Sequence, residues 1–558
     1  MIRDRLAAAV EQALNEAREA GEIQYDRLPE ITLEPPKGKA FGDYTTNIAM
    51  VMAREARMAP RQLAEKIIPR LPSLGGLIER AEVAGAGYIN FYLKPTWLHD
   101  IVLRIADEGE AYGRTDIGKG QKAQVEFVSA NPNGPIHVAH GRGGATGDAI
   151  ASMLEALGYD VTRESYINDA RSSHQMQCFG RSINARYMQA LGQDFPLPED
   201  AYRGEYVMDI AKEIVAEHGD KFLSMPEDER IRTFTDLGEE MMLREQKADL
   251  EKFGIKFDVW FSEQTLHDSG KVQEAIEKLK ERGYAYEKAG ALWLKSTEFG
   301  DDKDRTLVRS NGQPTYIAAD AAYHANKLDR GFDKVIDVWG PDHHGYIART
   351  KAAIAALGYD ADKVEIIIFQ VVRLYSGGEL VMMSKRAGDV VLLSDLVDEV
   401  GKDAARFFFL MRSPDSGLDF DLELAKSQTN ENPVYYVQYA HARICSILRK
   451  AVEEDGLQIP AARDVDLSVL GHEAEIDLMK KLGEYPDVVM EAGRTYEPHR
   501  LTRYAQDLAA VFHSFYGDCR VISEDAALTA ARLVLVDSTR TVLANNLRLL
   551  GISAPERM

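Results

Sequence analysis

The chain has 558 residues, of which 45% are hydrophobic and 28% are charged, as in ordinary globular proteins built from several domains. Its 67 basic and 89 acidic residues give a net charge of -22, which argues against a nonspecific nucleic-acid binder. No apolar run approaches the roughly 18 to 20 residues that span a bilayer. The three cysteines form no C-x-x-C pair, so we expect a cytoplasmic protein with no structural metal and no disulfide framework.

Residues 1–112 are predicted to form a small α+β domain. The opening stretch, MIRDRLAAAVEQALNEAREAG, mixes Glu with Arg and indicates a surface helix, not a secretory signal. Pro35 and Pro36 exclude helix from the loop that follows. Helical periodicity resumes in NIAMVMAREARMAPRQLAEKII, and RAEVAGAGYINFYL alternates as a strand does.

Residues 113–376 alternate short apolar strands with amphipathic helices. This pattern is typical of an α/β, Rossmann-like parallel sheet with crossover helices, and a charged helical insertion is expected at about 175–290. The predicted strands lie in AQVEFVS, YDVTRESYIND, KVIDVWG and KVEIIIFQVV. In such sheets ligands bind at the carboxyl ends of strands, where the strand order reverses. Two histidine-containing turns, HVAH and GPDHHGY, are expected at such ends.

The remaining chain is predicted to be helical. Residues 377–432 combine a basic loop with connecting helices, and residues 433–558 form an all-α domain. We therefore expect a multidomain protein with three kinds of domain: α+β, α/β and all-α.

The turn SANPNGPIHVAHGRGGATGDAI places His137 and His140 between a strand and a helix. Backbone N–H groups at a helix N-terminus bind phosphates, and Gly141, Gly143 and Gly144 would allow a ligand to approach the backbone. The two imidazoles could donate hydrogen bonds to phosphate oxygens in a transition state. The alternative is a glycine-bent turn with two surface histidines; a metal site is a weaker interpretation because no third ligand is nearby in the sequence.

Two other nucleotide-binding patterns do not fit this turn. A dinucleotide fingerprint, G-x-G-x-x-G, would need glycine at Thr146, whereas the third glycine is Gly147. No G-x-x-x-x-G-K-[ST] sequence occurs, which argues against a Walker-type ATPase.

A second motif lies in LVMMSKRAGDVVLL, about 245 residues further on. Met383, Ser384, Lys385 and Arg386 form a short basic loop, and a lysine over a nucleotide can neutralise a leaving pyrophosphate. By itself such a loop is usually solvated surface.

Together the H-x-x-H turn and the M-S-K-R loop resemble the "HIGH" and "KMSK" signatures of class I aminoacyl-tRNA synthetases. The flanking sequence is similar to bacterial arginyl-tRNA synthetases from about residue 40 to residue 450. Six stretches agree in order: GDYTTNIAM, the turn through SYINDA, DRTLVRSNGQPTYIAADAAYHANKL, VIDVWGPDHHGY, DAARFFFLMRSPDSGLDFDL and NPVYYVQYAHARI.

The resemblance implies an ATP site in which His137, His140 and Lys385 are the catalytic residues. The histidines would hold the ATP phosphates, and Lys385 would stabilise the transition state, with Mg²⁺ accompanying ATP. The expected ATP-binding residues are Asn131, Pro132, Asn133, Gly134, Pro135, Ile136, His137, Val138, Ala139, His140, Gly141, Asp342, His343, Met383, Ser384 and Lys385. For Asp342 the alternative is a helix N-cap.

The resemblance also implies an arginine site. A guanidinium is best met by a carboxylate in bidentate geometry, and the expected carboxylate is Asp320. The expected arginine-binding residues are Glu126, Asn131, Tyr316, Asp320 and His344. A carboxylate within the strand VEFV would be costly if buried and unpaired, a cost that a cationic substrate would relieve; the alternative is that this strand end is exposed.

The partners implied are ATP, L-arginine and tRNA(Arg), and the enzyme is expected to be a monomer. The C-terminal helices would read the anticodon loop through Tyr435, Tyr439 and Arg443, with Tyr436 and Gln438 as further candidates. In the N-terminal domain Phe41, Tyr44 and Asn47 would contact the tRNA elbow or pack that domain's own core.

Three departures from the family pattern stand out. Ala139 replaces the glycine between the histidines, Met382 replaces the first lysine of K-M-S-K, and ARSSHQM replaces the expected loop, which leaves the contacts of His174 and Gln175 open. The predicted function is arginine–tRNA ligation. The alternatives are a class I synthetase for another amino acid, a catalytically silent tRNA-binding paralogue, and a nucleotide-dependent dehydrogenase.

Overall fold

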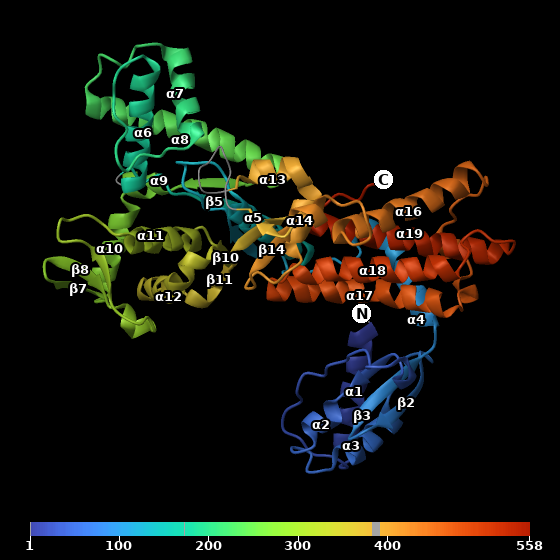
Figure 1. The fold of residues 1–558 in the computed structure, drawn as a ribbon. Coiled ribbons are helices and arrows are strands. Elements are labelled where there is room, and N and C mark those ends of the chain that lie inside the picture. Colours follow the sequence, from blue (N-terminus) through green and yellow to red (C-terminus); the bar gives the residue numbers. More distant parts are fainter. Residues whose placement is uncertain (1, 172, 382–390) are drawn as a thin grey trace. The chain divides into compact units, whose positions relative to one another are not determined.

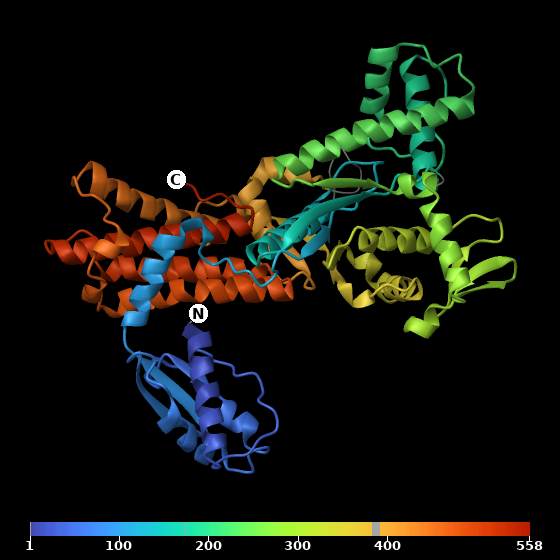
Figure 2. The ribbon, with the colours of Figure 1, turned by 180° about the vertical axis from the view of Figure 1, so that it is seen from behind.

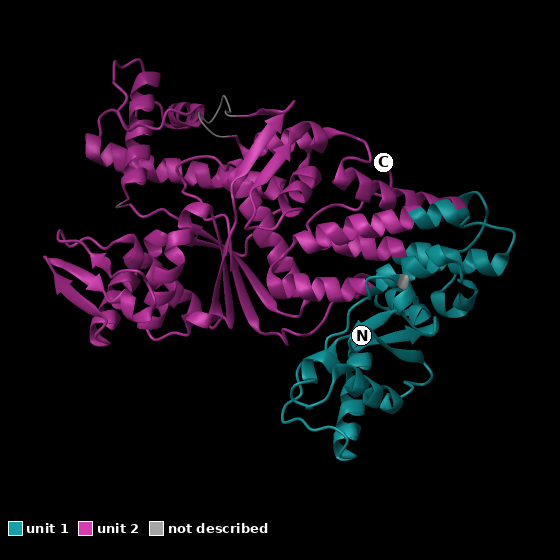
Figure 3. Cartoon of the chain, turned by 60° about the horizontal axis from the view of Figure 1, so that its bottom comes forward, with its two compact units in different colours: residues 1–109, 451–483, 514–538 teal, residues 110–450, 484–513, 539–558 magenta. Residues whose placement is uncertain are grey.

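The computed structural model describes residues 2–171, 173–381 and 391–558. The chain divides into two compact units, drawn in teal and magenta in Figure 3. The first unit is Met1–Gly109, Ala451–Gly483 and Ser514–Ser538; the second is Glu110–Lys450, Glu484–His513 and Thr539–Met558. The long C-terminal helices contribute to both units, and the four predicted domain ranges remain a prediction. Among the described helices, none has the length and apolar character needed to cross a membrane.

A three-stranded antiparallel sheet of order β1-β3-β2 forms the N-terminal part of the first unit, with helices beside it (Figure 1). The stretch predicted as one strand forms two, because Gly85 and Gly87 adopt positive φ angles and turn the chain. The expected α+β architecture is confirmed. The elements are α1 (Ile2–Glu19), β1 (Tyr44–Thr46), α2 (Ile48–Met52), α3 (Pro60–Ile67), β2 (Ile78–Ala84), β3 (Tyr88–Leu93) and α4 (Thr96–Glu108).

Five parallel strands form the central sheet of the second unit, in the order β11-β10-β4-β5-β6. The chain builds outward from β4 to β6 and then returns to place β10 on the other side of β4. The strand order therefore reverses between β4 and β10, where ligands of such sheets bind. The predicted Rossmann-like sheet is confirmed. The strands are β4 (Lys122–Glu126), β5 (Asp160–Ile167), β6 (Val259–Ser262), β10 (Lys334–Trp339) and β11 (Val364–Ile368).

The helical insertion expected at about 175–290 is not continuous. The helices α6, α7 and α8 pack against one another (Figure 2), and their buried apolar residues form a core of their own. The chain then enters the main sheet as β6, whose four half-buried residues are too few to show a strand period. A second insertion follows, with the antiparallel sheet β7-β8-β9. The elements are α6 (His174–Ala190), α7 (Glu205–His218), α8 (Glu227–Lys252), α9 (Glu263–Asp268), α10 (Lys271–Glu281), β7 (Ala285–Lys288), β8 (Ala291–Leu294) and β9 (Arg305–Val308).

Helices flank the central sheet and continue to the C-terminus. Helix α5 connects β4 to β5, and α11 precedes β10. The C-terminal part is helical, as expected. The elements are α5 (Val138–Ala156), α11 (Tyr316–Asp329), α12 (Ile347–Ala356), β12 (Val372–Ser376), β13 (Glu379–Leu380), α13 (Leu393–Val400), α14 (Lys402–Leu410), β14 (Leu418–Asp421), α15 (Leu422–Lys426), α16 (Pro433–Glu453), α17 (Glu473–Thr495), α18 (His499–Asp518) and α19 (Ala526–Leu549).

Candidate active site and nucleic-acid-binding pocket

The two signature histidines lie at the start of α5, the helix that follows β4 after a loop. Their rings stack with centroids 3.7 Å apart and planes inclined by 28°. The backbone N–H of His137 donates to Nδ1 of His140 at 3.4 Å. Because Nδ1 accepts, the proton of a neutral His140 must be on Nε2.

Burial keeps both imidazoles neutral. It lowers the pKa of His137, and burial together with repulsion from His137 lowers the pKa of His140 to about 3. At neutral pH the pair therefore offers uncharged N–H donors to phosphate oxygens and adds no positive charge. Positive charge has to come from elsewhere in the site.

The loop before the histidines is held by the α6–α8 insertion. The amide of Gln246 donates to the carbonyl oxygens of Asn131 at 3.0 Å and of Gly134 at 2.7 Å. The Asn131 side chain in turn donates to Oε1 of Gln175 at 2.8 Å. This contact gives Gln175 a partner; the sequence had left its contacts open because ARSSHQM departs from the family pattern.

Two tyrosines of the insertion secure the centre of the same loop. The hydroxyl of Tyr206 donates to the carbonyl of Asn133 at 2.8 Å, and the Asn133 side chain donates to the hydroxyl of Tyr202 at 3.0 Å. Upstream, Val128 has a φ of +54°, a strained conformation for a β-branched residue. The loop geometry is therefore imposed by its surroundings and not by local preference.

The glycines of α5 are explained by packing. A Cβ on Gly141 would lie 2.5 Å from a methyl carbon of Leu393, and one on Gly143 would lie 2.6 Å from the ring of Phe369. The interpretation that Gly143 and Gly144 leave room for a ligand is wrong, because protein side chains occupy that space. For Gly141 the packing reason is sufficient, and its role in ATP binding remains a prediction.

The basic loop with Met383, Ser384 and Lys385 lies outside the described residues, but the segment that follows it is fixed beside the histidines. The N–H of Val138 donates to the carbonyl of Val391 at 3.0 Å, and the N–H of Leu393 donates to the carbonyl of Ile136 at 2.9 Å. The residues that follow the basic loop are thus joined by backbone hydrogen bonds to the histidine turn at the start of α5.

Asp320 and Tyr316 lie one turn apart at the start of α11, as the sequence predicted. Tyr316 is exposed and Asp320 is half-buried. Burial and the nearby Glu126 carboxylate raise the pKa of Asp320 to about 6, against the opposing influence of His324, Lys327 and Arg349. Within the described ranges, no hydrogen-bond donor is found on the Asp320 carboxylate, so it is available to a ligand.

Further acidic groups surround Asp320 that sequence reasoning missed. Burial and the carboxylates of Asp320 and Asp169 raise the pKa of Glu263 to about 7. Asp169 is itself buried and accepts hydrogen bonds from the Ser262 hydroxyl at 2.5 Å and the Gln264 backbone at 2.8 Å. A cluster of carboxylates that repel one another favours a cation. No local pattern identifies Glu263, because α9 comes from the second insertion.

Glu126, at the end of β4, is 3% exposed, so the alternative that this strand end faces solvent is wrong. Its cost of burial is offset within the protein: Lys327 donates to it, and the Ser129 hydroxyl donates at 2.5 Å. Lys327 also donates to Asp337 at 2.6 Å. A cationic substrate is therefore not needed to satisfy Glu126, and its contact with arginine remains a prediction.

The GPDHHGY turn follows β10 as predicted and forms a short 3-10 helix, Pro341–Tyr346. Asp342, His343 and His344 are exposed. The residue that caps this helix is Gly340, so the interpretation of Asp342 as N-cap is wrong. All three side chains remain available at the carboxyl end of β10, although none has a contact that assigns its role.

An aromatic pocket of about 590 Å³ lies on α16 and α18 within the second unit. The rings of Tyr435 and Tyr439 are nearly parallel, at 6.1 Å and 9°, and Tyr439 and His513 are 6.1 Å apart at 29°. Nη1 of Arg443 donates to the Tyr439 hydroxyl at 2.8 Å. The lining residues are Gln428, Thr429, Asn430, Tyr435, Tyr436, Tyr439, Arg443 and His513.

The pocket brings together the three residues predicted to bind tRNA, with Tyr436 beside them. Gln438 faces elsewhere and donates to Asp403 at 2.9 Å. His513 was missed because it comes from another helix. In the N-terminal part Phe41 is 53% exposed, whereas Tyr44 is buried against Trp97 and therefore belongs to the core.

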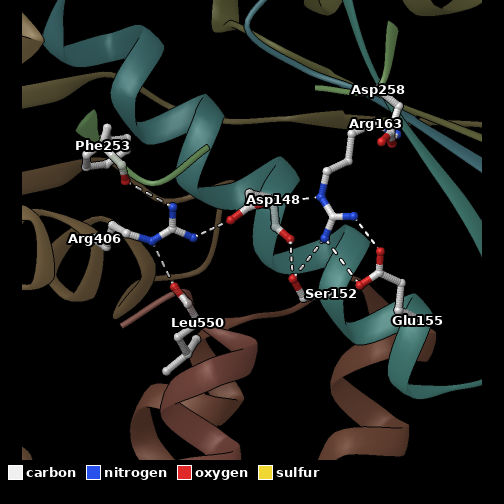
Figure 4. Close-up of polar contacts among 8 residues, drawn as sticks. All are labelled: Asp148, Ser152, Glu155, Arg163, Phe253, Asp258, Arg406 and Leu550. Atoms are coloured by element: carbon white, nitrogen blue, oxygen red, sulfur yellow. Dashed lines mark hydrogen bonds and ion pairs between the residues drawn. The ribbon is translucent and has the colours of Figure 1, made fainter. Parts of the chain in front are cut away.

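Helix α5 is anchored to the rest of the second unit by a buried ionic network (Figure 4). Asp148 accepts a hydrogen bond from Arg406 of α14 at 2.6 Å and another from Arg163 of β5 at 3.1 Å. Arg406 also donates to the carbonyl of Leu550, just after α19, at 2.9 Å. The helix that carries the histidines is thereby linked to the C-terminal end of the chain.

A parallel sheet with a reversal between β4 and β10, a histidine pair at the start of the helix that follows β4, and a segment from beyond the second signature bonded to that turn define the catalytic domain of a class I aminoacyl-tRNA synthetase. Three family models match the chain in order: "Arginyl tRNA synthetase N terminal domain" over residues 4–93, "tRNA synthetases class I (R), catalytic domain" over 103–412, and "DALR anticodon binding domain" over 437–558.

Relatives that match over nearly their whole length support the same family. The chain is 52% identical to the arginine–tRNA ligase of Heliobacterium modesticaldum over 561 residues, covering 100% of this chain and 99% of that one. It is 52% identical to the arginine–tRNA ligase of Moorella thermoacetica, covering 99% and 98%. The structure of Thermus thermophilus arginyl-tRNA synthetase superposes with a TM-score of 0.78 at 26% identity, covering 100% of both chains.

The chain belongs to the arginyl-tRNA synthetase family. The predictions of family, fold class and enzyme class, an arginine–tRNA ligase, are confirmed, and neither a silent paralogue nor a dehydrogenase finds support.

Proposed function

We propose that this enzyme joins L-arginine to tRNA(Arg) in two steps at the crevice between β4 and β10. The arginine carboxylate attacks the α-phosphorus of ATP, which forms arginyl-adenylate and releases pyrophosphate. A hydroxyl of the terminal tRNA adenosine then attacks the arginyl carbonyl and releases AMP. Both steps depend on positioning and charge stabilisation, so no protein nucleophile is required.

The ATP half of the site consists of the loop from Asn131 to Gly141, with Asp342 and His343 and the basic loop Met383–Lys385. His137 and His140 act as neutral donors, since burial lowers both pKa values. Lys385 supplies the positive charge that the imidazoles lack. Mg²⁺ travels with ATP and is held mainly by phosphate oxygens and water.

The arginine half of the site consists of Asp320, with Tyr316, Glu126, Asn131 and His344 around it. The observation that carries this assignment is the Asp320 carboxylate, which has no donor in the described part of the chain and lies among other acids. A guanidinium satisfies such a carboxylate in bidentate geometry. Glu263 and Asp169 strengthen the preference for a cation and disfavour neutral amino acids.

The aromatic pocket is the proposed site for an anticodon-loop base. Tyr435, Tyr439 and His513 offer stacking surfaces, and Arg443 offers donors to a base edge or phosphate. Localised recognition of this kind is compatible with a net charge of -22. The protein is further proposed to act in the cytoplasm as a monomer.

The function is tested by measuring the exchange of pyrophosphate into ATP that depends on an added amino acid. Each of the twenty amino acids is compared, with and without tRNA(Arg). Exchange is expected with arginine alone among the amino acids and is expected to need tRNA, as in this family. Activation of another amino acid would contradict the assignment of Asp320. Binding of tRNA without exchange or charging would favour the silent paralogue.

A further inference from the structure

The segment ARSSHQM, which departs from the family pattern, leads into a side-chain cluster at the start of α6. His174 and Cys178 are one turn apart on α6 and therefore lie on the same face. Asp200, from the loop between α6 and α7, reaches the same point. Cys178 is buried, whereas the His174 side chain is 76% exposed.

The three ligand atoms are close enough to share one ion. Nε2 of His174 lies 3.4 Å from Sγ of Cys178 and 3.7 Å from Oδ2 of Asp200, and Sγ lies 3.0 Å from Oδ2. Metal–ligand bonds of a tetrahedral zinc site place neighbouring ligand atoms about 3.3–3.6 Å apart. Two separations agree within about 0.4 Å, and Asp200 has to move by only about half an ångström.

We propose that His174, Cys178 and Asp200 bind one divalent cation of the zinc type. A thiolate, an imidazole and a carboxylate are the ligand set that such borderline-soft ions prefer. Three protein ligands leave a fourth position to water, which suits a partly exposed site. Within the described residues this is the one group of three such side chains whose ligand atoms converge.

Arg181 competes for the same atoms. Its Nη2 donates to Oδ2 of Asp200 at 2.6 Å and to Sγ of Cys178 at 3.1 Å. Ion binding therefore displaces the guanidinium from Oδ2 and releases the thiol proton, which costs affinity. The expectation of no structural metal rested on sequence spacing, which could not show that Asp200 comes close to Cys178.

The site lies beside the loop that is expected to hold ATP. Gln175, the residue after His174, accepts the hydrogen bond from Asn131 at 2.8 Å. An ion on His174 and Cys178 fixes the first turn of α6 and with it the partner of Asn131. Occupation of the site is expected to slow hydrogen exchange in residues 174–181.

The test is titration of the reduced, metal-free protein with Co²⁺, monitored by the thiolate-to-cobalt charge-transfer band. The band should saturate at one Co²⁺ per chain and disappear when Zn²⁺ is added. Cys178→Ser should abolish it, and His174→Ala should weaken Co²⁺ binding at least about tenfold. Cys519→Ser is the matched control, since Cys519 also lies 3.4 Å from a histidine, His472, but belongs to no such group of three among the residues that the structure describes.

Arg181→Gln removes the competitor and should strengthen Co²⁺ binding. Absence of the band from the wild-type protein would overturn the proposal, as would a band that persists in Cys178→Ser or an unchanged affinity in His174→Ala. Weaker binding in Arg181→Gln would contradict the proposed ligand set. Because the His174 side chain is mostly solvent-exposed, the His174→Ala variant is expected to fold and to keep the test decisive.

Discussion

The guanidinium of Arg406 donates a 2.6 Å hydrogen bond to the carboxylate of Asp148, and both side chains lie inside the protein. Arg406 comes from α14 and Asp148 from the middle of α5, so the pair fixes the helix that begins with the histidines. Since Arg406 also donates to the carbonyl of Leu550, it links α5 to the end of α19.

Arg406→Met should therefore destabilise the protein by about 3 kcal/mol, because it removes the fully buried partner of Asp148, which then keeps only Arg163, and also removes the donor to Leu550. Chemical denaturation measures the loss. Arg163→Met is the control: Arg163 is partly exposed and Asp148 keeps Arg406, so a smaller effect is expected. Equal losses for the two variants would contradict a dominant role for the Arg406–Asp148 pair.

Asp320→Asn should weaken arginine binding by about 2 to 4 kcal/mol, since a charged bidentate pair becomes a neutral contact of the same shape. Calorimetric titration with arginine, in the presence of tRNA, measures the change. Asp329→Asn is the matched control on the same helix: Asp329 is exposed and accepts a hydrogen bond from Tyr359. Unchanged affinity in Asp320→Asn would remove Asp320 from this role.

Arginine binding should depend on pH near 6. Burial raises the pKa of Asp320 to about 6, and arginine requires the ionised carboxylate. Affinity should thus fall by up to about tenfold for each pH unit below 6, after a smaller decline that begins near pH 7, where Glu263 takes up a proton. For the unliganded protein the sign is opposite: a raised carboxyl pKa stabilises the fold at low pH, and this contribution is lost as pH rises from about 4 to 6. A pH-independent arginine affinity between pH 5 and 7 would contradict this ionisation scheme.

Lys385→Ala should slow adenylate formation and leave arginine affinity nearly unchanged, the signature of a contact made in the transition state. Single-turnover measurement of arginyl-adenylate, beside an arginine titration, separates the two quantities. Lys363→Ala, at an exposed position before β11, is the control and should alter neither. A loss of arginine affinity equal to the loss in rate would argue for a ground-state contact.

Tyr439→Ala should weaken tRNA binding by about 1 to 3 kcal/mol, the contribution of one base–aromatic stack. Arginine affinity in tRNA-saturated enzyme should stay the same. Filter binding with tRNA(Arg) measures the effect, with Tyr88→Ala at an exposed position of β3 as control. If the two variants bound tRNA equally well, the aromatic pocket would not be the anticodon site.

The sequence was sufficient to predict a feature when all the residues that form it lie in one segment. Alternating strands and helices predicted the parallel sheet, and the spacing of His137 and His140 predicted their shared turn. Tyr316 and Asp320 are one helical turn apart, so their common face followed as well. Part of the aromatic pocket could also be predicted, because Tyr435, Tyr439 and Arg443 lie on successive turns of one helix.

The sequence was insufficient where a side chain meets a partner from a distant segment. Lys327 neutralises Glu126, 201 residues away, and no local pattern indicates that pairing. Glu263 joins the carboxylate cluster around Asp320 from the second insertion, and His513 joins the aromatic pocket from α18. Gly143 was misinterpreted for the same reason: Phe369, which fills its space, lies more than 200 residues further along the chain.

The stacked imidazoles and the carboxylates around Asp320 respond differently to a fall in pH. With a pKa of about 3, His140 stays neutral under mild acidification. Asp320 and Glu263, with pKa values of about 6 and about 7, do take up protons under mild acidification. With ATP at His140 and arginine at Asp320, as proposed, a drop in cellular pH would leave the protonation of His140 unchanged and weaken arginine binding, so that under acid stress the enzyme would need more arginine to reach the same rate.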